Sequence, residues 1–204
     1  MQIQHNTTPR TEKPKYIVIH TTGNTKAGAN AEAHYHYWNS GKVGSSADFV
    51  VDDEGFIQLN DYNKNYTWHC GDGKGKYGIT NSNSIGIEIC INEDGDFDKA
   101  VENAIELVKE LKLKTGITQV VRHYDASRKV CPAEFAPNNW EKWHDFLAAT
   151  KDTIKELESV NDIVWELAEK GIITDKDLWL NKLNKDTNAY WLARKTVNYM
   201  RGIK

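Results

Sequence analysis

Residues 118–132 contain the sequence pattern that decides the fold of this chain, together with two candidate functional residues, His123 and Cys131. A short apolar run is followed by a polar segment: Thr118-Gln119-Val120-Val121, then Arg122-His123-Tyr124-Asp125-Ala126-Ser127-Arg128-Lys129-Val130-Cys131-Pro132. The apolar run predicts a buried strand, so His123 lies where a strand gives way to a loop and Cys131 lies where that loop returns. A second histidine has the matching position, because His20 ends another apolar run, residues 15–19, just before a turn.

Two imidazoles and one thiolate at strand ends are suitable protein ligands for zinc. Structural zinc sites use four protein ligands, whereas three ligands leave a coordination position for water, as catalytic sites do. Taken singly, a buried histidine is more often a hydrogen-bonded core residue, and a cysteine a small apolar one. The prediction of a metal site therefore depends on His20, His123 and Cys131 occurring together.

Glu88 lies in the middle of an apolar strand, where a carboxylate needs a physical reason. The run Ser84-Ile85-Gly86-Ile87-Glu88-Ile89-Cys90-Ile91 alternates, so the isoleucines share one face and Glu88 lies on the other. Burying a carboxylate without a partner costs free energy. A water molecule at the metal site would supply that partner, and we predict that Glu88 faces this site.

The remaining patterns predict an α/β domain with a central mixed β-sheet flanked by helices. Residues 48–60 have the pattern of a hairpin that turns at Glu54 and Gly55. Helices are expected over residues 30–38, 96–113 and 139–147, the first capped by Asn30 and the second stopped by Gly116. We assign residues 1–150 to this domain and residues 151–158 to a linker or a helix extension.

Residues 159–204 predict a small all-helical appendage at the C-terminus. Three short amphipathic segments occupy residues 160–170, 174–183 and 187–200. Their aromatic residues, Trp165, Trp179, Tyr190 and Trp191, fit two alternatives. They build a small hydrophobic core, or they form a surface that stacks on sugars or peptides.

Composition narrows the class of partner. The net charge of −3 argues against nucleic acid, because phosphate binding needs a basic face. No run of eighteen apolar residues occurs, so we expect no membrane insertion. Residues 1–9 lack the pattern of a signal peptide, which predicts folding in the cytoplasm of the host cell. The three cysteines, Cys70, Cys90 and Cys131, do not form a disulfide framework.

These motifs together resemble the zinc-dependent N-acetylmuramoyl-L-alanine amidases of type 2, which include many phage endolysins and the animal peptidoglycan-recognition proteins. The resemblance covers residues 10 to 150 and is carried by residues 17–24, Trp68-His69, residues 84–88, residues 122–125 and residues 129–132. It implies a zinc-dependent enzyme that hydrolyses the amide bond between N-acetylmuramic acid and L-alanine in bacterial peptidoglycan. It also implies an enzyme that acts on the cell wall after release from the host cytoplasm.

The resemblance implies a role for each site residue. His20, His123 and Cys131 would hold Zn²⁺, Glu88 would transfer protons, and Lys129 would stabilise the developing oxyanion. His69 would contact the substrate and Trp68 would support the cleft wall. Two of these residues also have a structural alternative. Lys129 could be a solvated charge on a loop, and Trp68 could be an aromatic residue packed in the core.

The chain departs from some family members at one place. Where these relatives have a catalytic tyrosine or histidine, the chain has Ser46-Ala47-Asp48-Phe49. We infer that proton transfer falls to Glu88 and expect Asp48 to be an exposed residue at a strand edge or at the site rim. His34 and His36 are poor candidate ligands, because residues two apart on a helix point to different faces.

Two classes of function remain open at this point. The leading one is a peptidoglycan amidase, with the C-terminal helices as a possible cell-wall-binding domain, as in endolysins against thick-walled bacteria. The alternative is a non-catalytic peptidoglycan-binding protein on the same fold. Without the resemblance, the residues support only metal-assisted hydrolysis, which a deacetylase or a peptidase also performs.

Overall fold

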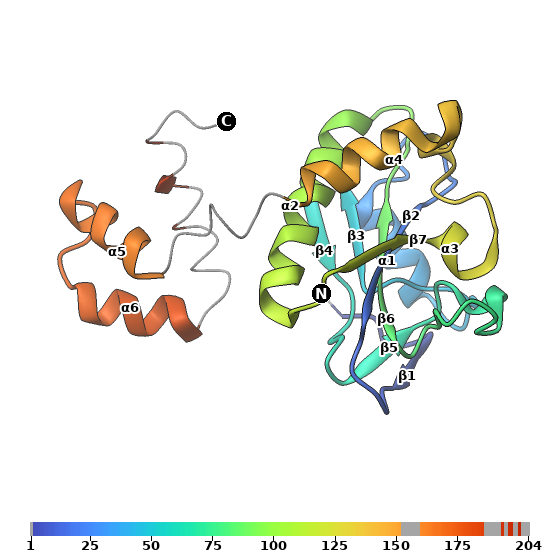
Figure 1. The fold of residues 1–204 in the computed structure, drawn as a ribbon, viewed down its shortest axis with the longest axis horizontal. Helices are drawn as coiled ribbons and strands as arrows, with labels where there is room; N and C mark the ends of the chain where they lie inside the picture. The colour runs from blue at the N-terminus through green and yellow to red at the C-terminus, as the bar shows by residue number, and fades with distance from the viewer. Residues whose placement is uncertain (1, 152–159, 186–192, 194–195, 198–199, 201–204) are drawn as a thin grey trace. The chain divides into compact units, whose positions relative to one another are not determined.

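The computed structural model of the protein describes residues 2–151, 160–185, 193, 196–197 and 200 (Figure 1). The chain separates into two compact units, residues 1–152 and residues 153–204. The predicted linker or helix extension at 151–158 lies, apart from residue 151, outside the described residues.

A five-stranded mixed sheet forms the centre of the first unit. Its strand order is β4 (Gly55–Gln58), β3 (Phe49–Asp52), β6 (Ser84–Ile89), β2 (Tyr16–Thr21), β7 (Gln119–Arg122). Strands β3, β6, β2 and β7 are parallel, and β4 pairs antiparallel with β3 in the predicted hairpin. A separate antiparallel pair joins β1 (Thr7–Pro9) and β5 (Asn65–Thr67). The predicted α/β class with a central mixed sheet is confirmed.

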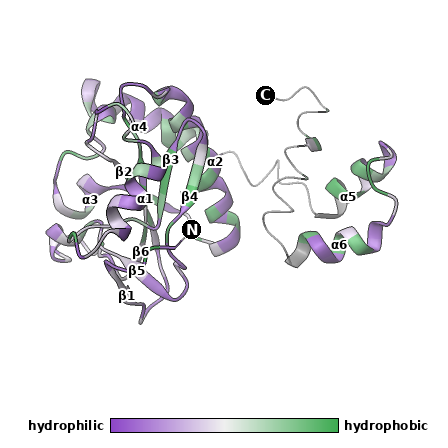
Figure 2. Cartoon of the chain, turned by 180° about the vertical axis from the view of Figure 1, so that it is seen from behind, coloured by the Kyte–Doolittle hydropathy of each residue, from purple (hydrophilic) through white to green (hydrophobic). Residues whose placement is uncertain are grey.

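Helices α2 (Phe97–Thr115) and α4 (Pro137–Ala149) cover one face of the sheet. Asp96 caps the start of α2 by accepting a hydrogen bond from the backbone of Lys99, and Gly116 ends the helix with a φ of 72°. The alternating isoleucines of β2 and β6 pack beneath these helices: Ile17, Ile19, Ile85, Ile87, Ile89. Figure 2 shows this core as hydrophobic strands and a hydrophobic inner side of α2.

Helix α1 (Ala31–Asn39) lies on the opposite face, where Ala31 and Trp38 pack with Val50 of β3. Asn30 caps this helix as predicted, since its side chain accepts a hydrogen bond from the backbone of Ala33. The isoleucine alternation leaves His20 and Glu88 on this second face of the sheet. The fold therefore brings both candidate site residues to the side that α1 covers only in part.

The segment after β7 differs from the prediction. His123 opens a five-residue helix, α3 (His123–Ser127), where the sequence predicted a loop. The carboxylate of Asp125 accepts hydrogen bonds from the backbone and guanidinium of Arg122, and this local pair stabilises the first turn. The backbone N–H of Tyr124 donates to the carbonyl of Cys131 at 3.0 Å, so the segment does return to the strand end as predicted.

The second unit contains α5 (Val160–Glu169) and α6 (Lys176–Lys185). Its core is made of these buried side chains: Ile163, Val164, Leu167, Ile173, Leu183, Ala193, Val197. Trp179 packs against this core, whereas Trp165 is 55% exposed with the ammonium of Lys176 3.5 Å from its ring centroid. Of the two alternatives for these aromatic residues, the small core thus fits Trp179 but not Trp165, and Tyr190 and Trp191 lie outside the described residues.

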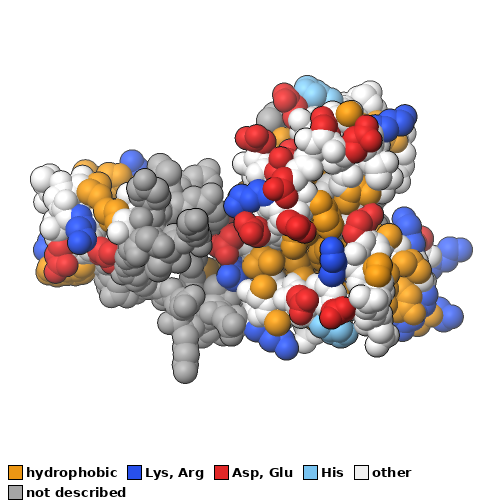
Figure 3. Space-filling view, turned by 90° about the horizontal axis from the view of Figure 1, so that it is seen from above, with side chains coloured by type: hydrophobic (Ala, Val, Ile, Leu, Met, Phe, Trp, Pro, Cys, Tyr) orange, Lys and Arg blue, Asp and Glu red, His pale blue; other side chains and the backbone are white. Residues whose placement is uncertain are grey.

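Charged side chains of both signs are spread over the surface of the first unit. Figure 3 shows a face on which acidic and basic groups are interspersed with hydrophobic ones. No helix among the described residues is long and apolar enough to cross a membrane.

Candidate metal centre and active site

The structure brings His20, His123 and Cys131 together at the carboxyl ends of β2 and β7. Their ligand atoms all lie within 4.8 Å of one another, and all three residues are buried. The Nδ1 atom of His20 is 3.7 Å from the Sγ atom of Cys131. Two ring nitrogens and one sulfur at these separations match the soft and borderline donors that zinc prefers.

The orientation of His123 indicates which of its atoms would bind a metal. Its Nε2 atom is 2.7 Å from the Oδ1 atom of Asp72, which lies in the short 3₁₀ helix Gly71–Gly73. Its Nδ1 atom is buried and has no hydrogen-bond partner among the described residues. A buried ring nitrogen without a partner costs free energy, and a metal ion at this position would remove that cost. The donor set therefore fits a metal.

Burial also sets the protonation of these groups. It lowers the pKa of His20 well below its ordinary value and lowers that of His123, so both rings are neutral and each has a free electron pair. Burial, with the charge of Glu88 nearby, raises the pKa of the Cys131 thiol to about 12. Binding of a cation here would release the thiol proton, as metal coordination by cysteine requires.

Glu88 lies beside His20, because the two residues are direct neighbours in the parallel register of β6 and β2. The Oε1 atom of Glu88 is 3.9 Å from His20 Nδ1, and its Oε2 atom is buried without a hydrogen-bond partner among the described residues. Burial raises the pKa of Glu88 to about 8, an effect that the charge of Lys129 opposes. This carboxyl group faces the candidate metal position, as the strand alternation predicted.

A cleft of about 460 Å³ opens onto these groups. Its lining includes the candidate ligands and Glu88 together with Lys129, Trp68 and Tyr37. Lys129 is an exposed residue of this lining. Trp68 both lines the cleft and is anchored, since its indole Nε1 donates to Thr8 Oγ1 at 3.0 Å. Trp68 is therefore a packed aromatic residue and also part of the cleft wall, so both alternatives hold for it.

His69 lies behind His20 and is mostly buried. Its Nδ1 atom is 3.0 Å from His20 Nε2, and its Nε2 atom is 3.1 Å from Ser84 Oγ. Burial, with a smaller effect from His123, lowers the pKa of His69 to about 3, so its ring is neutral. Sequence reasoning identified neither Ser84 nor Asp72 as part of the site, although the alternation of β6 places Ser84 on the face of Glu88.

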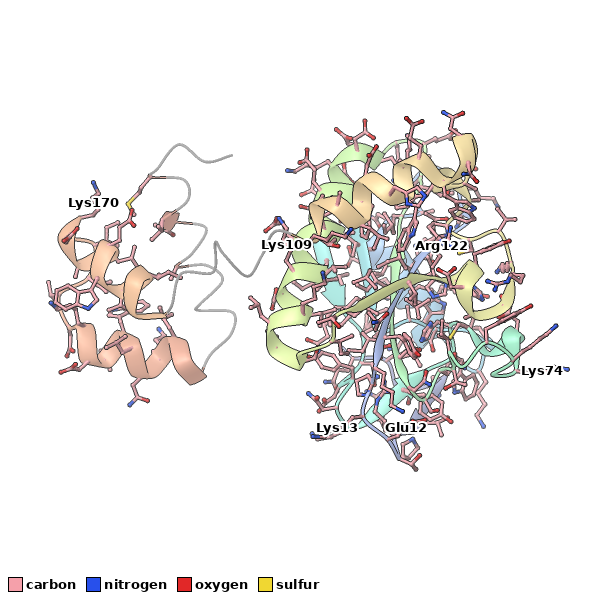
Figure 4. All side chains as sticks on the ribbon, viewed as in Figure 1. Glu12, Lys13, Lys74, Lys109, Arg122 and Lys170 are labelled. Atoms are coloured by element: carbon pink, nitrogen blue, oxygen red, sulfur yellow. The ribbon has the colours of Figure 1, made fainter. Side chains whose placement is uncertain are left out.

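Arg122 supports the site from the end of β7 (Figure 4). Its guanidinium makes two hydrogen bonds to Asp125, of 2.7 Å and 3.0 Å, and its carbon lies 4.2 Å from the ring centroid of Trp140. This stacking and pairing fix the start of α3, and so the backbone from which His123 projects.

Asp48 is not the exposed residue that the sequence predicted. It is fully buried and accepts hydrogen bonds from Asn60, from Thr67 and from the backbone N–H of Gly86, at 2.7, 2.9 and 2.8 Å. Burial raises its pKa, and these hydrogen bonds oppose the shift. Asp48 therefore ties the loops around the sheet to β6 and does not form the rim of the cleft.

His34 and His36 lie outside the group of candidate ligands. The Nδ1 atom of His34 is 2.8 Å from the carbonyl of Asn30, and the side chain of His36 is 68% exposed.

The family of the chain follows from its sequence profile together with this geometry. Residues 10–134 match the family of N-acetylmuramoyl-L-alanine amidases known as Amidase_2. The chain belongs to this family. Among solved structures, the catalytic domain of XlyA matches with a TM-score of 0.63 and 40% identity, over 72% of this chain and 94% of that chain. The structure of PlyL matches with a TM-score of 0.62 and 31% identity, over 75% of this chain and 99% of the PlyL chain. The resemblance predicted from the motifs is confirmed.

Curated relatives agree on the family. The N-acetylmuramoyl-L-alanine amidase CwlH of Bacillus subtilis (strain 168) is 40% identical over 136 residues, which cover 66% of this chain and 52% of CwlH. The amidase XlyA of the same strain is 42% identical over 137 residues, which cover 66% of this chain and 43% of XlyA. The chain thus spans about half the length of the curated relatives it matches.

Proposed function

We propose that the protein is a zinc-dependent amidase that hydrolyses the bond between N-acetylmuramic acid and L-alanine in bacterial peptidoglycan. The observation that carries this proposal is the buried cluster of His20, His123 and Cys131 with Glu88 beside it at the base of a cleft. Membership of the amidase family supplies the identity of the bond. A related structure described as an endolysin from Bacillus subtilis, 40% identical to this chain, supports a role of the endolysin kind.

Zinc would be held by the Nδ1 atoms of the two histidines and the sulfur of Cys131. When bound, zinc lowers the pKa of water from 15.7 toward about 7 and polarises a carbonyl group. Burial favours the protonated form of Glu88, and the positive charge of a bound zinc would restore its ionised form. The unpartnered Oε2 atom of that carboxylate is suited to accept the proton of the attacking water. Glu88 then delivers that proton to the amine of the leaving L-alanine residue.

Lys129 would stabilise the negative charge that develops on the carbonyl oxygen of the scissile amide. Its exposed ammonium group is attached to the segment that carries Cys131, and it lines the cleft. A charge held ready in this way typically contributes about 3 kcal/mol to transition-state stabilisation. Trp68 and His69 both line the cleft and would contact the glycan or the stem peptide.

A non-catalytic peptidoglycan-binding protein is the alternative function on this fold. Such a protein has no need for a buried carboxylate without a hydrogen-bond partner beside a set of metal-binding donors. The presence of Glu88 beside the donor set favours catalysis, because a carboxyl group there would face the water that a bound zinc activates.

The proposal is tested by incubating the protein with purified peptidoglycan, with and without a zinc chelator, and identifying the new chain ends. We expect release of peptides with a free N-terminal alanine, loss of this release with the chelator, and recovery on addition of Zn²⁺. Cys131→Ala should lose zinc content and activity together. Full activity of this variant, or new ends at another bond, would overturn the proposal.

A further inference from the structure

A chain of hydrogen bonds extends from His20 away from the cleft. His20 Nε2 is 3.0 Å from His69 Nδ1, His69 Nε2 is 3.1 Å from Ser84 Oγ, and Ser84 Oγ donates to the carbonyl of Thr80. His20, His69 and Ser84 are all buried. The proposed catalytic steps use neither Ser84 nor the carbonyl of Thr80.

The last link fixes the direction of every hydrogen bond in the chain. A carbonyl oxygen only accepts, so the single hydroxyl proton of Ser84 is directed at Thr80. Ser84 Oγ must then accept from His69, which places the proton of the neutral His69 ring on Nε2. His69 Nδ1 consequently has no proton and accepts from His20 Nε2.

The consequence for His20 is a defined tautomer. With its proton on Nε2, the ring of His20 carries its free electron pair on Nδ1, the atom 3.7 Å from Cys131 Sγ. Metal-binding histidines commonly donate their second N–H to another group, and this contact fixes both tautomer and ring orientation. For His20 that group is His69.

Gly86 makes room for this arrangement. A Cβ atom at position 86 would lie 2.6 Å from Cγ of His69 and 2.8 Å from two further ring atoms, closer than real Cβ contacts. The ring of His69 therefore lies directly against the backbone of β6, beside Ser84 and on the face of Glu88.

We propose that His69 is a positioning residue, which together with Ser84 and the Thr80 carbonyl holds His20 in the tautomer whose Nδ1 binds the metal. This role rests on the proposed metal site and is separate from the substrate contact that the family resemblance predicts for His69. A positioning role acts on metal affinity before any substrate is present, whereas a substrate contact acts on KM.

The first test measures zinc affinity by competition with a chromophoric chelator. We expect His69→Ala to weaken zinc binding by about 10- to 100-fold, the range for groups that orient metal ligands. His69→Asn should recover most of this loss, because the Asn Oδ1 atom occupies the place of Nδ1 and accepts from His20. Zinc affinities of both variants equal to that of the wild type, with only KM changed, would overturn the proposal.

The second test concerns Ser84, which connects the ring of His69 to the carbonyl of Thr80 and so anchors this series of hydrogen bonds. Ser84→Ala removes the acceptor for His69 Nε2 and should also weaken zinc binding. Ser82→Ala is the matched control, since Ser82 lies two residues away and its hydroxyl contacts Glu12 and Thr80 but not His69. Equal zinc affinities for Ser84→Ala and Ser82→Ala would contradict the proposed anchor.

A third measurement needs no variant and no metal. Long-range ¹H–¹⁵N NMR spectra of the metal-free wild-type protein report which ring nitrogen of each histidine carries the proton. We expect Nε2–H for both His20 and His69. A proton on Nδ1 of His69 would overturn the inference, even if the protein hydrolyses peptidoglycan as proposed. Absence of zinc binding by the wild type would instead overturn the proposed function.

Discussion

Replacing Asp72 by alanine should weaken metal binding without unfolding the domain. The Oδ1 atom of Asp72 is 2.7 Å from His123 Nε2, a short hydrogen bond between a carboxylate and an imidazole N–H. A hydrogen bond to a charged group contributes about 1.5–3 kcal/mol. The Asp72 side chain is 49% exposed, so water can take its place as acceptor in the variant, and we expect a loss near the lower limit. A loss of about 1.4 kcal/mol corresponds to a roughly tenfold weaker zinc affinity.

The assay is equilibrium competition for Zn²⁺ at neutral pH, with thermal unfolding of the metal-free proteins measured in parallel. Asp72→Asn keeps an acceptor near His123 Nε2 and should lose less affinity than Asp72→Ala. Asp98→Ala removes the same charge from an exposed position in the first turn of α2, and should bind zinc as the wild type does. If Asp72→Ala and Asp98→Ala bind zinc equally well, the orienting role of Asp72 is refuted.

Three further predictions concern catalysis, stability and the C-terminal unit. Glu88→Gln should keep its zinc but lower kcat by at least about 100-fold, because the proton acceptor is lost; steady-state kinetics with unchanged kcat would exclude Glu88 as that group. Asp48→Ala leaves three buried donors without their acceptor, at about 1–3 kcal/mol each. Its free energy of unfolding in urea should fall by at least about 3 kcal/mol, and a fall below about 1 kcal/mol would contradict this account. Truncation after Asp152, the end of the first unit, should leave a folded amidase that binds intact cell walls more weakly in a pelleting assay; unchanged binding would show that residues 159–204 do not bind the wall.

The sheet and the ligand cluster were predictable because their signals are local in sequence. The alternation in residues 84–89 fixes which face carries Glu88, and the apolar runs before His20 and His123 fix where each strand ends. Parallel strands end at the same edge of a sheet, and side chains at these ends meet where the strands are neighbours, as β2 and β7 are. The sequence predicted the grouping of His20, His123 and Cys131 from their places at strand ends, and the structure adds that β2 and β7 are adjacent.

The supporting residues were not predictable, since their contacts join segments far apart in the chain. Asp48 has the sequence surroundings of an exposed residue, and its burial depends on donors from Asn60, Thr67 and Gly86 that only the folded loops assemble. Asp72 stands in a glycine-rich segment with no sign of a partner 51 residues later. Likewise, the sequence left open whether Trp165 is buried, and its position on α5 turns it away from the small core.

The candidate ligands His20 and Cys131 are separated by 111 positions in the chain. A cation held between them would act as a removable crosslink, because it closes a loop that includes most of the catalytic unit. An ion that binds only the folded state stabilises it by RT ln(1 + [Zn²⁺]/Kd), which is about 4.1 kcal/mol when the free ion is at about 1,000 times its Kd. Zinc would thereby join the end of β2 to the segment that follows β7, and removal of the ion should lower the free energy of unfolding of the first unit.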